Sequence, residues 1–290
     1  MKQLYGHLGA LFVVTIWGTT FVSSKTLLNA GMQPADIFFM RFVIAYICMI
    51  GISHRRLWAK NLRDELTLLG LGVMGGSLYF LTENMALMYS TSANVSILVS
   101  TTPLLTAIIV SACYSNERMT RRQVLGSLVA FVGAALVVLN GQMVLNINPL
   151  GDALAIGAAV TWALYSLFMR RVMQRYSPDF ITRKVFAYGL LTILPYIIYV
   201  EEFNYSISLW KSATVVGNIL FLGLLASTIC YLLWNWVMRE LGAVKSTNYI
   251  YLQSLITMIA GALILNERIT LMGLCGALVL IIGMFYAVKR

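Results

Sequence analysis

Two copies of one short sequence decide how this chain folds: residues 116–120 read Asn-Glu-Arg-Met-Thr, and residues 266–270 read Asn-Glu-Arg-Ile-Thr. The copies lie 150 positions apart. With that shift and no gap, residues 92–140 align with residues 242–290, and fourteen of the 49 aligned positions are identical. Shared hydrophobicity does not explain a repeated polar segment, so the chain contains an internal repeat.

The composition places this repeat in a membrane protein. Of 290 residues, 59% are hydrophobic and only 11% are charged, and the mean hydropathy is +0.80. A soluble domain carries about 25% charged residues. The apolar residues form runs of about 20 residues, which is the length that crosses a ~30 Å hydrocarbon core. We therefore expect an all-α membrane protein with ten transmembrane helices, at 5–27, 36–52, 66–88, 93–115, 122–140, 150–171, 179–200, 214–238, 243–264 and 270–288.

The basic residues support this number of helices. If ten helices alternate in direction, 17 of the 21 Lys and Arg residues fall on the side where the chain begins. The four others are Lys25, Arg41, Lys211 and Arg268. The positive-inside rule assigns the basic side to the cytoplasm. We therefore expect a multi-pass protein of the plasma membrane, in a bacterium the inner membrane, with both termini cytoplasmic.

Five helices per copy is an odd number, so the second copy enters the membrane upside down. We expect two inverted five-helix repeats, at 1–141 and 149–290. Inverted repeats are typical of alternating-access transporters, whose solute site lies near the bilayer midplane between the repeats. Thr120 and Thr270 stand where a hydroxyl would cap the helix that follows each Asn-Glu-Arg segment.

Other function classes find little support in the sequence. The excess of ten positive charges is divided among short loops, so we expect no nucleic-acid partner. The four cysteines lie in apolar runs without a His or Cys neighbour at metal-ligand spacing, and no P-loop is present. A membrane enzyme would need clustered His, Asp or Glu. The sequence predicts no metal site, no cofactor and no enzymatic activity.

Several segments share their order and spacing with a known family. They are Trp17-Gly18-Thr19-Thr20-Phe21 with Lys25, Phe39-Met40-Arg41-Phe42, Ala86-Leu87-Met88-Tyr89-Ser90-Thr91-Ser92-Ala93, and the two Asn-Glu-Arg segments with Gly126, Gly133, Gly276 and Gly283. Through these residues the whole chain resembles the EamA-type drug/metabolite transporter (DMT) superfamily in its ten-helix form. The resemblance implies a plasma-membrane permease, often an exporter, for amino acids, other metabolites, nucleobases or toxic compounds. It also implies a central site surrounded by the helices at 5–27, 66–88, 93–115, 150–171, 214–238 and 243–264.

Glu83 is the one acidic residue well inside a predicted span, about six residues or ~9 Å below its outer edge. An ionisable side chain at such a position indicates function and a nearby partner. Arg41 and Lys25 are candidate partners, because both are expected at the outer mouth. Two interpretations are open. In the functional one, Glu83 binds an ammonium group or takes up a coupling proton. In the structural one, it forms an ion pair with Arg41 or Lys25 that locks helices together, or its side chain snorkels outward.

Trp17 and Trp162 correspond in a looser repeat with a shift of 145, and both lie near the middle of a span. Interfacial tryptophans prefer the headgroup level, so central ones need another reason. They line the cavity and stack on the solute, or they fill the seam between the repeats. Tyr79, Tyr165 and Asn235 supply the few polar groups that a mostly aromatic pocket requires.

Pro103 interrupts the helix expected at 93–115. Because it cannot donate to the carbonyl of Val99, it frees an acceptor and permits a kink. In the repeat Gln253 aligns with Pro103, and it shares a helix face with Tyr249. These residues line the solute path or form hydrogen bonds between helices.

The sequence predicts a secondary-active permease or exporter of small polar metabolites, such as amino acids, that works by alternating access. The alternative is a lipid-flipping or scaffold subunit that transports no metabolite. Glu83 and the paired tryptophans favour transport. The expected partners are a small-molecule substrate, the lipid bilayer, a coupling proton and, through seams of small residues, a second copy of the chain.

Overall fold

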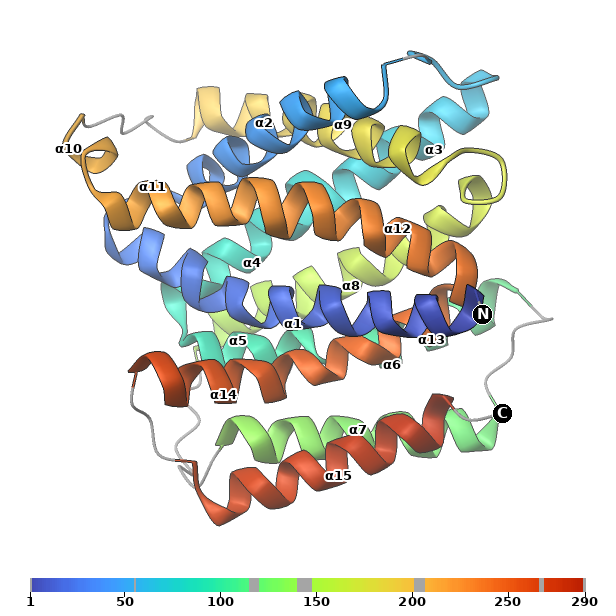
Figure 1. Ribbon diagram of the computed structural model, residues 1–290, viewed down its shortest axis with the longest axis vertical. Helices are drawn as coiled ribbons and strands as arrows, with labels where there is room; N and C mark the ends of the chain where they lie inside the picture. Colours follow the sequence, from blue (N-terminus) through green and yellow to red (C-terminus); the bar gives the residue numbers. More distant parts are fainter. Residues whose placement is uncertain are drawn as a thin grey trace.

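The computed structural model describes residues 2–54, 56–114, 120–139, 148–200, 207–265 and 269–288, and these residues contain helices and no strand (Figure 1). The first half contains α1 (Lys2–Asn29), α2 (Pro34–Ile52), α3 (Leu62–Gly72), η1 (Val73–Ser77), α4 (Leu78–Tyr89), α5 (Ser92–Val99), α6 (Thr102–Cys113) and α7 (Arg121–Leu139). The second half contains α8 (Pro149–Val172), α9 (Pro178–Tyr199), α10 (Ile207–Trp210), α11 (Ala213–Leu220), η3 (Phe221–Ile229), α12 (Cys230–Leu241), α13 (Ala243–Thr247), η4 (Asn248–Tyr251), α14 (Leu252–Leu265) and α15 (Leu271–Val288).

The expectation of an all-α membrane protein is confirmed. Within the described ranges, seven helical units have the length and hydropathy of membrane spans: Gln3–Asn29, Pro34–Ile52, Leu62–Tyr89, Asn94–Cys113, Pro149–Val172, Pro178–Tyr199 and Ala213–Leu241. Three further apolar helices, α7, α14 and α15, lie beside them (Figure 1). Each of the ten ranges expected from the sequence overlaps one of these units. The short α10 was not expected.

Four of the helical units are interrupted. The interruptions form two pairs, and in each pair one member lies in the first half and the other at the corresponding position of the second half. The kink expected at Pro103 is a break, because α5 ends at Val99 and Pro103 lies in the first turn of α6. Thr102 Oγ1 donates to the carbonyl of Val99 at 2.6 Å, which satisfies the acceptor that the proline leaves free. In the second half, η4 interrupts the matching unit between α13 and α14. The π-helical segments η1 and η3 interrupt the other matched pair, α3–α4 and α11–α12.

Helices α7 and α15 pack with their backbones close together. A Cβ atom added to Gly133 would overlap the backbone of Leu280, and one added to Gly283 would overlap the backbone of Ala130. The glycines that follow each Asn-Glu-Arg segment therefore allow these two helices to approach, as small residues do in membrane helix pairs. They join the end of one half to the end of the other (Figure 1).

The expected caps of these helices are present. Thr120 Oγ1 accepts from Gln123 N at 3.2 Å, and Thr270 Oγ1 accepts from Gly273 N at 3.3 Å. Both bonds satisfy amides in the first turn of a helix. The Asn-Glu-Arg segments themselves, at 116–118 and 266–268, lie outside the described residues.

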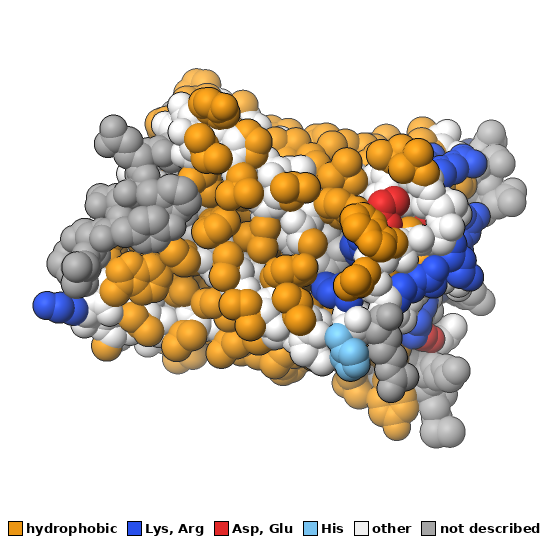
Figure 2. All heavy atoms as spheres, turned by 90° about the horizontal axis from the view of Figure 1, so that it is seen from above, with side chains coloured by type: hydrophobic (Ala, Val, Ile, Leu, Met, Phe, Trp, Pro, Cys, Tyr) orange, Lys and Arg blue, Asp and Glu red, His pale blue; other side chains and the backbone are white. Residues whose placement is uncertain are grey.

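The molecular surface has an apolar belt and one basic end. Figure 2 shows hydrophobic side chains over most of one face and Lys and Arg side chains gathered at one end. We call this the basic end. It carries the α2–α3 and α8–α9 loops, with Arg56, Arg63 and Arg175 in or beside them. We call the opposite end the far end.

Candidate solute-binding site

A small cavity of about 20 Å³ lies between the two halves of the bundle. Six of the residues singled out from the sequence line it, namely Trp17, Arg41, Tyr79, Glu83, Trp162 and Gln253. The first half also contributes Thr20, Phe21, Phe80, Val99 and Thr102, and the second half contributes Tyr231 and Ile250. The cavity thus contains one basic and one acidic side chain among aromatic rings.

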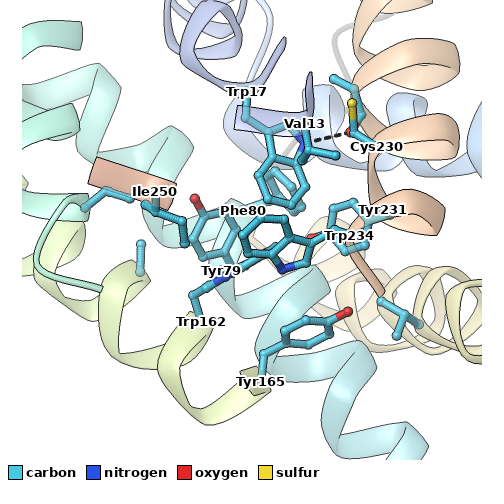
Figure 3. Packing of buried hydrophobic residues seen from close by; sticks show 14 of the residues in the cluster. Val13, Trp17, Tyr79, Phe80, Trp162, Tyr165, Cys230, Tyr231, Trp234 and Ile250 are labelled. Carbon is cyan, nitrogen blue, oxygen red and sulfur yellow. Dashed lines mark hydrogen bonds between the residues drawn. The ribbon is translucent and has the colours of Figure 1, made fainter. Parts of the chain in front are cut away.

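The rings around the cavity come from both halves and contact one another (Figure 3). Trp17 of α1 and Trp162 of α8 meet edge to face, with centroids 5.3 Å apart and an interplanar angle of 89°. The ring centroid of Tyr79 of α4 lies 4.9 Å from that of Trp162, and the ring centroid of Tyr231 of α12 lies 5.7 Å from that of Trp17. Offset and edge-to-face pairs of this kind are favourable beyond the area that they bury. The two central tryptophans therefore line the cavity and also fill the seam between the halves.

Two of these rings bind carbonyl groups in the π-helical segments. Trp17 Nε1 donates to the carbonyl of Ala226 in η3 at 2.9 Å. At the end of η3, Cys230 N bonds to the carbonyl of Leu225, five residues before it, which is the spacing of a π-helix. Tyr231 OH likewise donates to the carbonyl of Gly75 in η1. The π-helical segments are thus part of the cavity wall.

Arg41 is 2% exposed and enters the cavity from α2. Its Nε donates to Ser227 Oγ at 2.9 Å, and its guanidinium lies 4.3 Å from the centroid of the Phe80 ring. A buried guanidinium needs such contacts, because removing it from water is costly. The arginine joins α2 to η3, the π-helical segment of the second half.

Glu83 is 5% exposed and accepts a hydrogen bond from Tyr79 OH at 3.2 Å, one helical turn before it on α4. Among the ion pairs of the described residues, none joins Glu83 to Arg41 or Lys25. The two charges of Glu83 and Arg41 nevertheless interact at the cavity, so both interpretations of Glu83 remain predictions. Lys25 Nζ instead donates to the carbonyls of Leu87 and Ser90, at the C-terminal end of α4.

The other predicted residues lie outside the cavity lining. Tyr165 OH donates to Asn235 Oδ1, and Asn235 Nδ2 donates to Thr182 Oγ1 at 2.8 Å, which joins α8, α12 and α9. Tyr249 OH pairs with His7 Nδ1 at 2.6 Å between η4 and α1. Pro103 starts α6, and its neighbour Thr102 reaches the cavity. These residues support the helices that carry the lining.

Sequence reasoning missed seven lining residues, and helical spacing could have found several. Thr20 and Phe21 follow Trp17 by three and four positions, so they share its helix face. Phe80 precedes Glu83 by three positions. A shift of 151 residues between the halves aligns Tyr231 with Phe80, and it also aligns Trp234 with Glu83.

Polar contacts between the halves close the bundle at both ends of the cavity. At the basic end, Glu65 of α3 accepts from Lys184 Nζ and Tyr188 OH of α9. At the far end, Asn94 Nδ2 of α5 donates to Asp152 Oδ1 of α8 at 2.8 Å. These contacts hold the two halves together at both ends of the bundle.

Interrupted, apolar helices around a buried polar cavity are typical of membrane transport proteins. The EamA-like transporter family matches residues 4–139 and 149–289. The chain belongs to this family, a part of the DMT superfamily.

Relatives along nearly the whole chain carry transporter names. An "uncharacterized transporter" of Archaeoglobus fulgidus is 26% identical over 280 residues, which are 96% of each chain. A "probable amino-acid metabolite efflux pump" of Escherichia coli is 24% identical over 284 residues, covering 95% of this chain and 92% of the relative. A solved crystal structure with 17% identity superposes with a TM-score of 0.76, covering 98% of this chain and 97% of the other, and so supports the fold.

Proposed function

We propose that the protein is a secondary-active transporter of small polar metabolites such as amino acids, which pass through the central cavity by alternating access. The observation that carries this proposal is the placement of Arg41 and Glu83 in one cavity between the halves. Intramembrane ionisable residues mark solute or ion pathways. Inverted repeats place such a site where either half can expose it to one side of the membrane.

The size of the cavity fits an occluded state. A space of about 20 Å³ holds about one water molecule. A metabolite therefore enters only when the walls move apart. The contacts Glu65–Lys184 at the basic end and Asn94–Asp152 at the far end join the two halves, so alternate breaking of these contacts would open one end at a time.

The interrupted helices offer places for this movement. Discontinuous helices next to the site recur in inverted-repeat transporters. Here η1 and η3 carry carbonyls that accept hydrogen bonds from side chains of the other half, and the α5–α6 break lies at the cavity through Val99 and Thr102. The proposed movement is bending at these interruptions.

The proposal includes the direction of transport and its coupling to protons. The relatives named as efflux pumps support export across the plasma membrane, and the basic end would then face the cytoplasm. Glu83 is the group proposed to take up a coupling proton, since its carboxylate and Tyr79 OH lie at the cavity.

Reconstitution into liposomes tests the function. Purified full-length protein is first screened for thermal stabilisation by amino acids, nucleosides and cationic drugs. Any compound that stabilises it is then loaded inside liposomes, and its release is measured with and without a pH gradient. We expect release of a polar metabolite that depends on the protein. Stabilisation by lipid headgroups alone, with movement of labelled lipid and of no metabolite, would replace this proposal with lipid flipping.

A further inference from the structure

Arg41 has more hydrogen-bond donors than the protein uses. A guanidinium has five N–H groups in a planar fork. Within the described part of the chain, Arg41 makes one hydrogen bond, from its Nε to Ser227 Oγ. Its two terminal nitrogens therefore remain available to bind a solute in the cavity that Arg41 lines. A planar fork of this kind fits both oxygens of a carboxylate.

Trp162 supplies a second unused donor at the same cavity. Its side chain is 4% exposed, and within the described residues its Nε1 is buried without a hydrogen-bond partner. A buried N–H group without a partner costs about 1–3 kcal/mol. Trp162 lines the cavity, but its Nε1 has almost no accessible surface, so an acceptor on a solute reaches this N–H only when the cavity walls move apart.

The same cavity also contains a negatively charged hydrogen-bond acceptor, Glu83. The Glu83 carboxylate accepts a hydrogen bond from Tyr79 OH, which is the one side-chain hydrogen bond that it makes within the described residues. Its further acceptor positions fit the N–H groups of an ammonium. The cavity thus has a donor group, Arg41 with Trp162, and an acceptor group, Glu83.

Other cations of the spans are engaged elsewhere. Lys25 binds the carbonyls of Leu87 and Ser90, and Lys184 binds Glu65. Among the described residues that line the cavity, Arg41 is the only cation and Glu83 the only anion.

We infer that the solute is a zwitterion whose carboxylate binds between Arg41 and Trp162 and whose ammonium group binds Glu83. This inference rests on the proposed transport function and deepens it. The carboxylate would bridge the halves, because Arg41 belongs to the first and Trp162 to the second. The apolar body of the solute would pack against rings such as Phe80 and Tyr231.

Matched sets of three probes test the inference by binding to the full-length protein in nanodiscs. Each set holds an amino acid, its amide, which lacks the carboxylate, and its deaminated acid, which lacks the ammonium. Sets built on alanine, leucine and phenylalanine cover different body sizes. We expect one amino acid to bind at least about tenfold more tightly than both of its analogues, the effect of one hydrogen bond to a charged group.

Two tryptophan variants provide a matched comparison. Trp162→Phe removes the indole N–H at the cavity, and we expect about tenfold weaker binding of the amino acid with the amide unaffected. Trp234→Phe removes an N–H that is equally buried and unpartnered within the described residues, but Trp234 does not line the cavity. We expect this variant to bind the amino acid as the original protein does. Arg41→Lys, which keeps the charge and loses the fork, should weaken amino-acid binding in the same selective way.

The outcomes separate the inference from the proposed function. Equal binding of the amino acid and its amide, or equal effects of Trp162→Phe and Trp234→Phe, overturns the carboxylate subsite. Equal binding of the amino acid and its deaminated acid overturns the role of Glu83. If the liposomes release another metabolite while none of the sets binds, the zwitterion inference fails and the transport proposal stands. If no compound is bound or moved, both fail.

Discussion

The indole of Trp17 donates a hydrogen bond of 2.9 Å to the carbonyl of Ala226, 209 residues further along the chain. Tyr231 OH makes the reciprocal contact with the carbonyl of Gly75. In each case an aromatic ring from one half binds the π-helical segment of the other half. The rings that line the cavity are thereby tied to the two segments that are proposed to bend.

Trp17→Phe tests this relationship, because phenylalanine keeps an aromatic ring and loses the N–H. The carbonyl of Ala226 would remain buried without its side-chain donor, and we expect a loss of about 1–3 kcal/mol in stability. The smaller ring contributes a further loss by packing. Thermal unfolding in detergent measures the change. Trp236→Phe is the control for ring size, since Trp236 is half-buried and has no hydrogen bond among the described residues. Equal losses in the two variants would contradict a role for the Ala226 bond.

The fold could be predicted from the sequence because its main determinants are local or repeated. Runs of apolar residues specify spans, and the match of residues 92–140 to 242–290 relates the halves. Proline chemistry predicted the α5–α6 break. The π-helical segments could not be predicted, since no local pattern in the sequence marks η1 or η3, and their contacts at Gly75 and Ala226 are with residues of the other half.

The site was predicted in part, because some of its residues are of types that are unusual in a membrane span. Residues with unusual chemistry for a membrane span, such as Arg41, Glu83 and Trp162, could be recognised by type and meet at the cavity. Lys25 was recognised in the same way, but it binds the end of α4. Charge type alone does not reveal which carbonyls a long side chain will reach. Tyr231 and Phe80 were missed because aromatic residues are common in such spans.

Glu83→Gln tests proton coupling. Glutamine is nearly isosteric and still accepts a hydrogen bond from Tyr79 OH, but it takes up no proton. We expect uphill transport driven by a pH gradient to be abolished. Solute exchange across liposomes should continue at solute concentrations raised about tenfold, which offset the loss of the contact between the carboxylate and the ammonium group. Tyr79→Phe is the companion variant, since it removes the hydroxyl and keeps the titratable carboxyl group, so coupled transport should persist. Normal uphill transport by Glu83→Gln would exclude this residue as the proton carrier.

Gly133→Ala tests the close packing of α7 and α15. The added methyl group would overlap the backbone of Leu280, so the helices must separate. Overpacking of this kind costs about 1–3 kcal/mol, and we expect a lower unfolding temperature. Gly157→Ala is the control, because a Cβ atom there meets nothing within 4 Å and alanine is the better helix former. That variant should unfold at the same temperature or a higher one. A Gly133→Ala protein as stable as Gly157→Ala would show that the two backbones are not in close contact.

Glu65→Gln tests the closure of the basic end. Glu65 accepts from Lys184 Nζ, Tyr188 OH and Ala59 N, and so it joins α3 of the first half to α9 of the second. A hydrogen bond to a charged group contributes about 1.5–3 kcal/mol, so loss of the charge should increase opening at this end by a factor on the order of ten. Hydrogen–deuterium exchange would then be faster in peptides from the start of α3 and unchanged in peptides from α7 and α15.

Glu240→Gln is the matched control at the end of α12. Glu240 pairs with its sequence neighbour Arg239 at 3.7 Å, so within the described residues its charge joins no separate helices. Exchange in α3 should therefore stay as in the original protein. The double variant Glu65→Lys, Lys184→Glu restores opposite charges at the two positions and should recover part of the protection. If Glu65→Gln exchanges no faster than Glu240→Gln, the ion pair does not close the basic end, and the helices there are held by apolar packing alone.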